Sequence, residues 1–300
     1  MEKQRNKKGS LPIGVRIIGI IIAVLAAAYG LYAGMGNSTG NFDGEMQIFA
    51  LDVGQGDSFF IISPNGKTML IDSGESSNSK QIEQFIREKG VRQLDVVIGS
   101  HTHSDHVGSM PYLLDAFDVG KYVMPEAGLE TRIQKRINAV LEEKDIPCSY
   151  VWAGDVIDWD SDCKVTVLSP VPEFDEYSKT DWNEWSLIIR AEYANHSMIF
   201  TGDATVRSEQ AAMLNNEKHL FDADVLKVPH HGSTTSSSLG FLEAVSPEYA
   251  IISVGKGNSY GHPDYDTIQK LKQVNAEIYR TDELGTINIV FSANDIKITY

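Results

Sequence analysis

Short apolar runs and amphipathic segments follow one another from residue 46 to the end of the chain. Apolar runs bounded by Gly, Pro, Asn or Asp predict β-strands, and apolar residues spaced three and four apart predict helices. The expected strands are 46–53, 58–63, 68–72, 94–99, 148–152, 164–168, 186–193, 197–201, 224–228, 249–254, 277–281, 286–291 and 295–299. The expected helices are 79–89, 131–143, 205–214, 239–244 and 266–274.

The order of these elements indicates a fold class. Helices alternate with strands through the middle of the chain, and strands follow one another directly near both ends of this region. Helices that alternate with strands cover the faces of a sheet, so we expect a layered α/β (α+β) architecture with mixed sheets. The pattern assigns one globular domain to 46–300, preceded by a polar, Gly-rich linker at 36–45.

The first 35 residues have a different pattern. Segment 1–16 is basic, and 17–35 is an uncharged, mostly apolar run that is just long enough, as a helix, to cross a bilayer. Basic residues ahead of such a helix predict a cytoplasmic N-terminus. We therefore expect a single-pass cell-membrane protein whose 46–300 domain is extracytoplasmic. A cleaved signal peptide, which would leave a secreted domain, is the alternative because small residues occur at 26–28 and 33–34.

The charge of the chain bears on its partners. It carries 26 Lys plus Arg against 41 Asp plus Glu, and the region after residue 35 has no basic stretch. Tight binding of long nucleic acid is therefore not favoured. The only two cysteines, Cys148 and Cys163, could pair in an exported chain or remain free thiols, and the sequence leaves both alternatives open.

The strongest chemical signal directly follows the expected strand 94–99. His101, His103, Asp105 and His106 place four ligand-type side chains within six residues. In extended backbone, alternate residues point to one side, so His101 and His103 can reach a common ion while Asp105 and His106 reach a neighbouring one. Imidazole and carboxylate are usual ligands of Zn²⁺. A metal site is predicted; a polar loop that happens to contain three histidines is the alternative.

Further ligand-type residues lie where other strands should end. Asp203 follows the strand 197–201, and His230 and His231 follow the strand 224–228. His262 lies past a third strand. Six of the eight histidines thus fall into three clusters, which favours one shared site over scattered structural histidines.

These motifs resemble the metallo-β-lactamase fold superfamily, whose HxHxDH pattern matches 101–106. More narrowly, they resemble the hydrolase domain of ComEC-type competence proteins. The segments that carry this narrower resemblance are 51–58 (LDVGQGDS), 71–74 (IDSG), 201–204 (TGDA) and 226–233 (LKVPHHGS). The resemblance covers about 46–300 and implies a four-layer αββα sandwich with two divalent metal ions, Zn²⁺ first and Mn²⁺ as the alternative.

The resemblance also implies roles for single residues. His101 and His103 would hold the first metal, Asp105 and His106 the second, and Asp203 would bridge the two. One of His230 and His231 would complete the second site, and the spacing of the motif favours His231. Asp72 would support the histidine loop from behind the ligands.

One departure from the superfamily concerns the first metal. A further histidine ligand is expected between residues 106 and 203, where the only histidine is His196. ComEC-like sequences have an asparagine near a Ser-Leu strand instead, which corresponds to Asn183. The first metal would then be held less tightly, and Mn²⁺ would suit the site as well as Zn²⁺.

The ligand set implies hydrolysis by a water molecule that two cations ionise near neutral pH. Asp105 or Asp203 would orient this nucleophile. His262 would donate a proton to the leaving group or contact a phosphate, with a structural role before Pro263 as the alternative.

The leading hypothesis for function is an extracytoplasmic phosphodiesterase, either nuclease-like or acting on a surface phosphodiester. The alternatives are a carboxylic ester, thioester or lactam hydrolase, and a non-catalytic metal-binding module associated with DNA uptake. The expected partners are the membrane, through the N-terminal helix, and a phosphodiester or other ester substrate. Nucleic acid stays an option that the acidic charge does not favour.

Overall fold

The computed structural model describes residues 44–126, 131–172 and 181–300. The expected membrane helix at 17–35, the basic segment 1–16 and nearly all of the linker lie outside the described residues. Within the described part of the chain, every helix is too short or too polar to span a bilayer.

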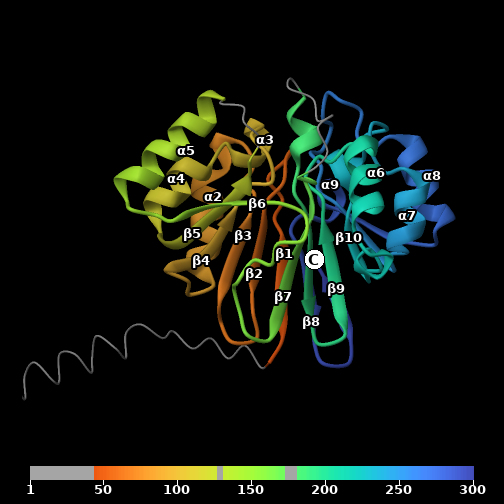
Figure 1. Ribbon diagram of the computed structural model, residues 1–300, viewed down its shortest axis with the longest axis horizontal. Coiled ribbons are helices and arrows are strands. Elements are labelled where there is room, and N and C mark those ends of the chain that lie inside the picture. Colours follow the sequence, from red (N-terminus) through yellow and green to blue (C-terminus); the bar gives the residue numbers. More distant parts are fainter. Residues whose placement is uncertain (1–43, 127–130, 173–180) are drawn as a thin grey trace, which may run out of the picture. The chain divides into compact units, whose positions relative to one another are not determined.

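The first of two β-sheets contains both the N-terminal strands of the domain and its C-terminal hairpin (Figure 1). Its strand order is β14 (Ile296–Thr299), β13 (Ile287–Phe291), β1 (Met46–Ala50), β2 (Phe59–Ile62), β3 (Thr68–Ile71), β4 (Gln93–Ile98), β5 (Asp118–Pro125) and β6 (Cys148–Val151). Strands β3 to β6 run parallel, and the other neighbours pair antiparallel.

The second sheet is built from the later part of the chain. Its order is β12 (Glu277–Arg280), β11 (Tyr249–Ile252), β10 (Val225–Lys227), β9 (His196–Phe200), β8 (Ile188–Tyr193) and β7 (Cys163–Ser169). Strands β9 to β12 are parallel, while β7, β8 and β9 form an antiparallel meander. Both sheets are therefore mixed, as the sequence pattern predicts.

Helices cover the outer face of each sheet, which makes four layers. Helices α2 (Ser79–Glu88), α4 (Met110–Ala116) and α5 (Arg132–Glu143) pack on the first sheet, and α6 (Val206–Asn215), α7 (Leu239–Val245) and α8 (Tyr265–Gln273) on the second (Figure 1). The short elements are α3 (Ser104–Val107), α9 (Thr281–Leu284) and the 3₁₀ turns Ser76–Asn78, Trp182–Trp185, Lys218–Leu220 and Pro229–Gly232. The mixed α/β sandwich expected from the sequence is confirmed.

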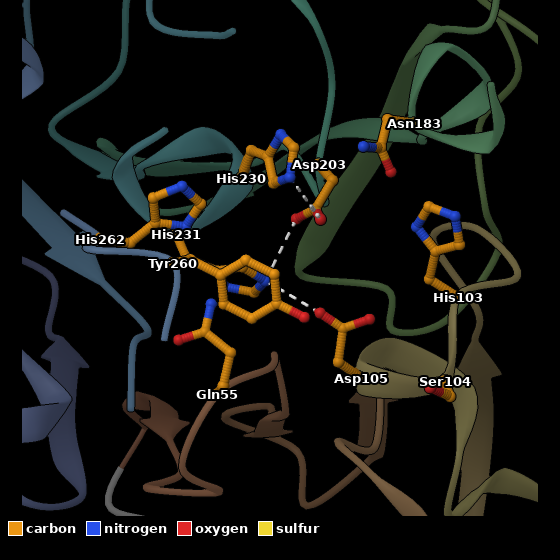
Figure 2. A pocket seen from close by; sticks show the side chains of 10 residues that line it. All are labelled: Gln55, His103, Ser104, Asp105, Asn183, Asp203, His230, His231, Tyr260 and His262. Atoms are coloured by element: carbon orange, nitrogen blue, oxygen red, sulfur yellow. Dashed lines mark hydrogen bonds and ion pairs between the residues drawn. The ribbon is translucent and has the colours of Figure 1, made fainter. Parts of the chain in front are cut away.

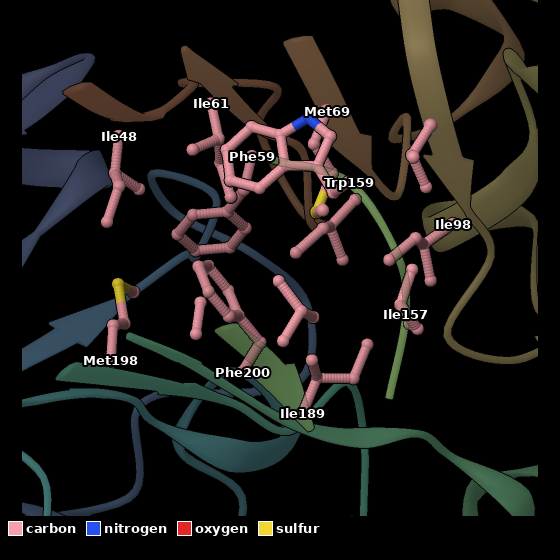
Figure 3. Packing of buried hydrophobic residues seen from close by; sticks show 14 of the residues in the cluster. Ile48, Phe59, Ile61, Met69, Ile98, Ile157, Trp159, Ile189, Met198 and Phe200 are labelled. Carbon is pink, nitrogen blue, oxygen red and sulfur yellow. The ribbon is translucent and has the colours of Figure 1, made fainter. Parts of the chain in front are cut away.

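The apolar layer between the sheets holds the two halves of the domain together. Phe59 and Ile61 point into this layer, whereas Phe60 and Ile62, the alternate residues of β2, face the helices. The strand is therefore apolar at every position, because it is covered on both faces. Phe59 meets Phe200 of the second sheet edge to face, with ring centroids 5.2 Å apart (Figure 3).

The main local difference from the sequence pattern is the segment 104–125, for which the pattern indicates no element. The structure has α3, α4 and β5 there. Helix α4 is only seven residues long and has Pro111 in its first turn, and β5 contains Gly120 and is buried mainly in its second half. Neither element is long or regular enough to show a period.

The two cysteines are free thiols in this structure. Cys148 begins β6 and is exposed, while Cys163 begins β7 in the other sheet and packs against the layer between the sheets. Of the two alternatives that the sequence leaves open, the structure shows the unpaired one.

Truncating the contact between the sheets tests this description of the core. Phe200→Ala should lower the free energy of unfolding by about 3–5 kcal/mol, because it removes a buried ring and leaves a cavity. Leu214→Ala is the control, since Leu214 is 84% exposed and the change should cost less than about 0.5 kcal/mol. Chemical denaturation of both variants measures the difference; equal effects would contradict the packing described.

Candidate metal centre

The site lies where strands of both sheets end at a common edge of the sandwich. The loop after β4 carries the HxHxDH motif, the turn after β9 carries Asp203, and the turn after β10 carries His230 and His231. Figure 2 shows His103, Asp105, Asp203, His230 and His231 converging on one pocket. Its volume is about 310 Å³. It is lined by Gln55, His103, Ser104, Asp105, Asn183, Asp203, His230, His231, Tyr260 and His262.

His101, His103 and Asp203 form the first group of potential ligands. His101 Nε2 lies 3.1 Å from His103 Nδ1 and 4.0 Å from Asp203 Oδ2. His101 is buried, and His103 stands between it and the pocket. The extended backbone at His103 accounts for this placement, because it turns the two rings toward the same point.

Asp105, His106, Asp203 and His231 form the second group. His106 Nε2 lies 3.0 Å from Asp203 Oδ1, and His231 Nε2 lies 3.3 Å from Asp105 Oδ2 and 3.6 Å from Asp203 Oδ1. Asp105 and His106 belong to the short helix α3, which turns them away from the first group.

Asp203 belongs to both groups. Its Oδ1 faces His106 and His231, and its Oδ2 faces His101, so one carboxylate offers an oxygen to each group. Within each group the ligand atoms all lie within 4.8 Å of one another. His106 Nε2 and Asp203 Oδ1 are buried and form an ion pair with each other, but neither atom makes a hydrogen bond of good geometry. Buried polar atoms need partners, so this donor set fits divalent cations.

The turn Pro229–Gly232 separates its two histidines. His230 and His231 both have left-handed backbone, with φ of 51° and 53°, which sends the neighbouring rings to different places. His231 Nδ1 donates to the carbonyl oxygen of Ser253 at 2.9 Å, so Nε2 faces the second group. His230 stays at the rim, with Nδ1 2.9 Å from Thr235 Oγ1 and Nε2 3.6 Å from Asp203 Oδ2. Only His231 thus belongs to a ligand group.

Asp72 lies directly behind the histidine loop. Its carboxylate accepts from the Ser100 backbone N–H at 2.7 Å, from Ser100 Oγ at 2.6 Å and from His106 Nδ1 at 2.9 Å. The last bond leaves His106 Nε2 as the atom that faces Asp203. Asp72 therefore orients a ring of the second group.

His196 lies at the opposite end of strand β9 from the first group and cannot be one of its ligands. It begins β9 and stacks near Phe291, with ring centroids 5.6 Å apart, whereas Asp203 follows the other end of the same strand. Asn183 lines the pocket instead, on the side of His103 (Figure 2). Its Oδ1 is buried without a hydrogen-bond partner. Beside His103, the pocket therefore has the side-chain oxygen of Asn183 and not the imidazole of His196.

His262 and Tyr260 form the outer wall of the pocket. The two rings stack with centroids 5.7 Å apart, and the His262 ring lies 5.7 Å from that of His230. The Asn258 side chain holds this loop by accepting from the backbone N–H groups of Tyr260 and His262, both at 3.1 Å. His262 therefore faces the pocket and not the ligand groups, and burial lowers its pKa.

The ligand groups perturb one another strongly. Burial opposes a charge on His106, but the carboxylates of Asp203 and Asp105 outweigh it and raise the pKa of His106 well above its usual range. Asp203 responds in the opposite direction: its pKa is held well below the usual range by His106 and His231, against the effect of burial. His101 has a lowered pKa because it is buried beside another imidazole.

Two functional candidates emerge from the structure that the sequence motifs did not single out as site residues. Asp57 and Lys227 are both 1% exposed and form an ion pair beneath the ligand groups. Gly56 allows the turn before Asp57 to approach, because a Cβ there would lie 2.3 Å from the Asp105 carbonyl oxygen. The available signal was a lysine within an otherwise apolar strand, next to the histidine motif.

Comparison with known proteins agrees with this fold. The family model described as the metallo-beta-lactamase superfamily matches residues 51–256. ComE operon protein 3 of Bacillus subtilis (strain 168) is 34% identical over 260 residues, 81% of this chain and 33% of that protein. Recombination protein 2 of Haemophilus influenzae is 29% identical over 257 residues, 84% of this chain and 30% of that protein.

A solved structure shares the fold at low sequence identity. The crystal structure of CmlA, a diiron beta-hydroxylase from Streptomyces venezuelae, matches with a TM-score of 0.50 and 12% identity over 78% of this chain and 52% of that chain. The chain thus belongs to the metallo-beta-lactamase superfamily, as a metal-dependent hydrolase whose curated homologues are competence and recombination proteins of the ComEC type. It spans about a third of the length of those relatives.

We expect the binding of a divalent ion to release protons near neutral pH. Against the effect of burial, Asp203, Asp105 and Asp57 raise the pKa of His231 to about 9 in the metal-free protein, so its ring carries a proton at pH 7. A metal ion requires the neutral ring. Affinity should therefore rise with pH up to about 9. Calorimetric titration in buffers of different ionisation enthalpy measures the protons released; none released would contradict ligation by His231.

Proposed function

We propose that this protein is a phosphodiesterase with two divalent metal ions, His101, His103 and Asp203 holding one, and Asp105, His106, Asp203 and His231 holding the other. The observation that carries the proposal is the Asp203 carboxylate, which has one oxygen in each ligand group at the floor of an open pocket. A shared carboxylate suits a pair of ions close enough to act on one substrate group.

Residues of the pocket then have separate roles in the reaction. Two divalent ions would supply a water of lowered pKa and a Lewis acid. Asp105, which is only partly buried and faces the pocket, or Asp203, which also lines it, orients the attacking water. His262 donates a hydrogen bond to an oxygen of the substrate, as phosphate contact or toward the leaving group. Because burial lowers the pKa of His262, it acts as a neutral donor at pH 7.

The rim of the pocket supports a phosphodiester as the substrate. His230, His262, Tyr260 and Asn183 all bring hydrogen-bond donors to the opening, and the carboxylates lie on the floor. Two cations and neutral donors complement the single negative charge and the two free oxygens of a phosphodiester. The competence and recombination proteins among the relatives favour a nucleic-acid phosphodiester, whereas the overall charge of −15 disfavours tight binding of a long strand.

The location is also part of the proposal. The apolar segment 17–35 after a basic N-terminus would anchor the chain by a single membrane span. The 46–300 domain would then act outside the cytoplasm, or be secreted if that segment is cleaved.

A substrate panel tests the reaction. The full chain should hydrolyse bis-p-nitrophenyl phosphate and single-stranded DNA but not nitrocefin. Asp203→Ala should lower kcat/KM by about 100-fold or more, because it removes a ligand from both groups, and supporting residues already contribute about 10–100-fold. His219→Ala is the matched control, since His219 is exposed beside Glu217 and outside the pocket.

Each outcome of the panel has a distinct meaning. Hydrolysis of nitrocefin or a thioester instead of phosphodiesters would support a carboxylic ester or lactam hydrolase. Two bound ions without turnover of any ester would support a metal-binding module. Unchanged activity in Asp203→Ala would overturn the site itself.

The metal preference depends on Asn183 in this proposal. Its carbonyl oxygen is a harder ligand than imidazole and suits Mn²⁺ at least as well as Zn²⁺. Asn183→His should therefore shift the preference toward Zn²⁺, with Zn²⁺ binding about 10-fold more tightly or better. Competitive titration of the two ions measures the shift, with Asn216→His, outside the pocket, as the control. An unchanged ratio would exclude Asn183 from the first metal.

A further inference from the structure

A buried ammonium group lies directly beneath the candidate metal centre. Of the lysine and arginine side chains that the structure describes, Lys227 is the one that is almost completely buried, at 1% exposed. It ends strand β10, between Leu226 and Val228, both of which face the helices over the second sheet. The alternation of a strand turns Lys227 the other way, toward the site.

The ammonium group makes three contacts, each with a part of the site. It donates to the Gly202 carbonyl oxygen at 2.6 Å and forms an ion pair with Asp57 Oδ2. Its Nζ also lies 3.9 Å from Asp203 Oδ1. Lys227 therefore holds the peptide group just before Asp203 and lies close to the carboxylate itself.

Asp57 explains how a charged lysine can stay in this position. An isolated buried charge is costly, but a paired and hydrogen-bonded one is tolerated. Asp57 in turn lies 3.4 Å from His231 Nδ1 and 3.6 Å from His106 Nδ1. The pair thus contacts the back of both histidines of the second group.

Asp57 also belongs to a further group of potential ligands. Asp57, Asp72 and His106 form a third buried group whose atoms could hold a cation. The ammonium group of Lys227 forms an ion pair with Asp57. This third group therefore already contains a cation that belongs to the protein.

We propose that Lys227 is a positioning residue, whose ammonium group, neutralised by Asp57, fixes the Gly202–Asp203 backbone so that Asp203 presents one oxygen to each metal group. This role rests on the metal sites of the proposed function. Figure 2 shows one oxygen of Asp203 directed at His231 of the second group and the other at His230 on the rim, and this other oxygen also faces His101 of the first group.

The test separates positioning from simple charge balance. Lys227→Met alone leaves Asp57 without its cation and should unfold at a lower temperature than the wild type. The double variant Lys227→Met/Asp57→Asn has no unpaired charge at this point and should regain most of that loss. If Lys227 positions Asp203, the double variant still binds the second of two equivalents of Zn²⁺ or Mn²⁺ about 10–100-fold more weakly.

A second pair of variants isolates the hydrogen bond to Gly202. Lys227→Gln in the Asp57→Asn background keeps a donor, whereas Lys227→Met in the same background does not. The glutamine variant should therefore bind the second ion more tightly than the methionine variant. If the methionine variants do not fold, the glutamine variant is compared directly with the wild type. Calorimetric titration of the full chain, stripped of metal by a chelator, gives stoichiometry and affinity, and thermal unfolding is followed in parallel.

Wild-type affinity for both ions in the double variants would overturn the proposal, because Lys227 would then only balance the charge of Asp57. The titration needs no turnover. A wild-type protein that binds two ions but hydrolyses no phosphodiester would overturn the proposed function and leave the role of Lys227 standing.

Discussion

The apolar interface between the two sheets is the constraint on which the rest of the structure depends. Phe59 and Phe200 meet there from opposite sheets, and both belong to the apolar cluster that holds the sheets face to face. The histidine loop leaves β4 of the first sheet, whereas Asp203 and His231 leave β9 and β10 of the second. The ligand set is divided between the two sheets. The centre therefore depends on the core, which holds the two sheets against each other.

The electrostatics of the centre follow from this convergence. Asp57, Asp72 and Asp203 are all buried within reach of the same histidine, His106. Buried carboxylates at such distances repel one another and lose hydration, so they require cations. Part of the compensation is built into the chain as Lys227 and the histidines. The rest fits divalent ions, whose charge would lower the cost of burying the Asp203 carboxylate.

The centre is unequal on its two sides. The second group is supported from behind by Asp72 and by the Ser253 carbonyl oxygen, which orient His106 and His231. The first group has two histidines and an asparagine at the pocket wall in place of a further imidazole. Ligands that are oriented by supporting residues bind metal more tightly, which is why the proposed function expects the two positions to differ in affinity and in the metal they favour.

The sequence by itself determined the residue types of the centre and most regular elements. Four ligand-type residues in 101–106 and apolar runs covered on both faces are local patterns, and local patterns can be read without knowing the fold. Only the tertiary structure decided which histidine of the pair turns inward, that His196 lies at the wrong end of its strand, and that Asp57 meets Lys227. These facts depend on left-handed backbone at one turn and on contacts between residues up to 170 positions apart. The sequence pattern also did not predict short elements such as α4 and β5. They lack a regular spacing of apolar residues, and packing in the assembled sandwich stabilises them.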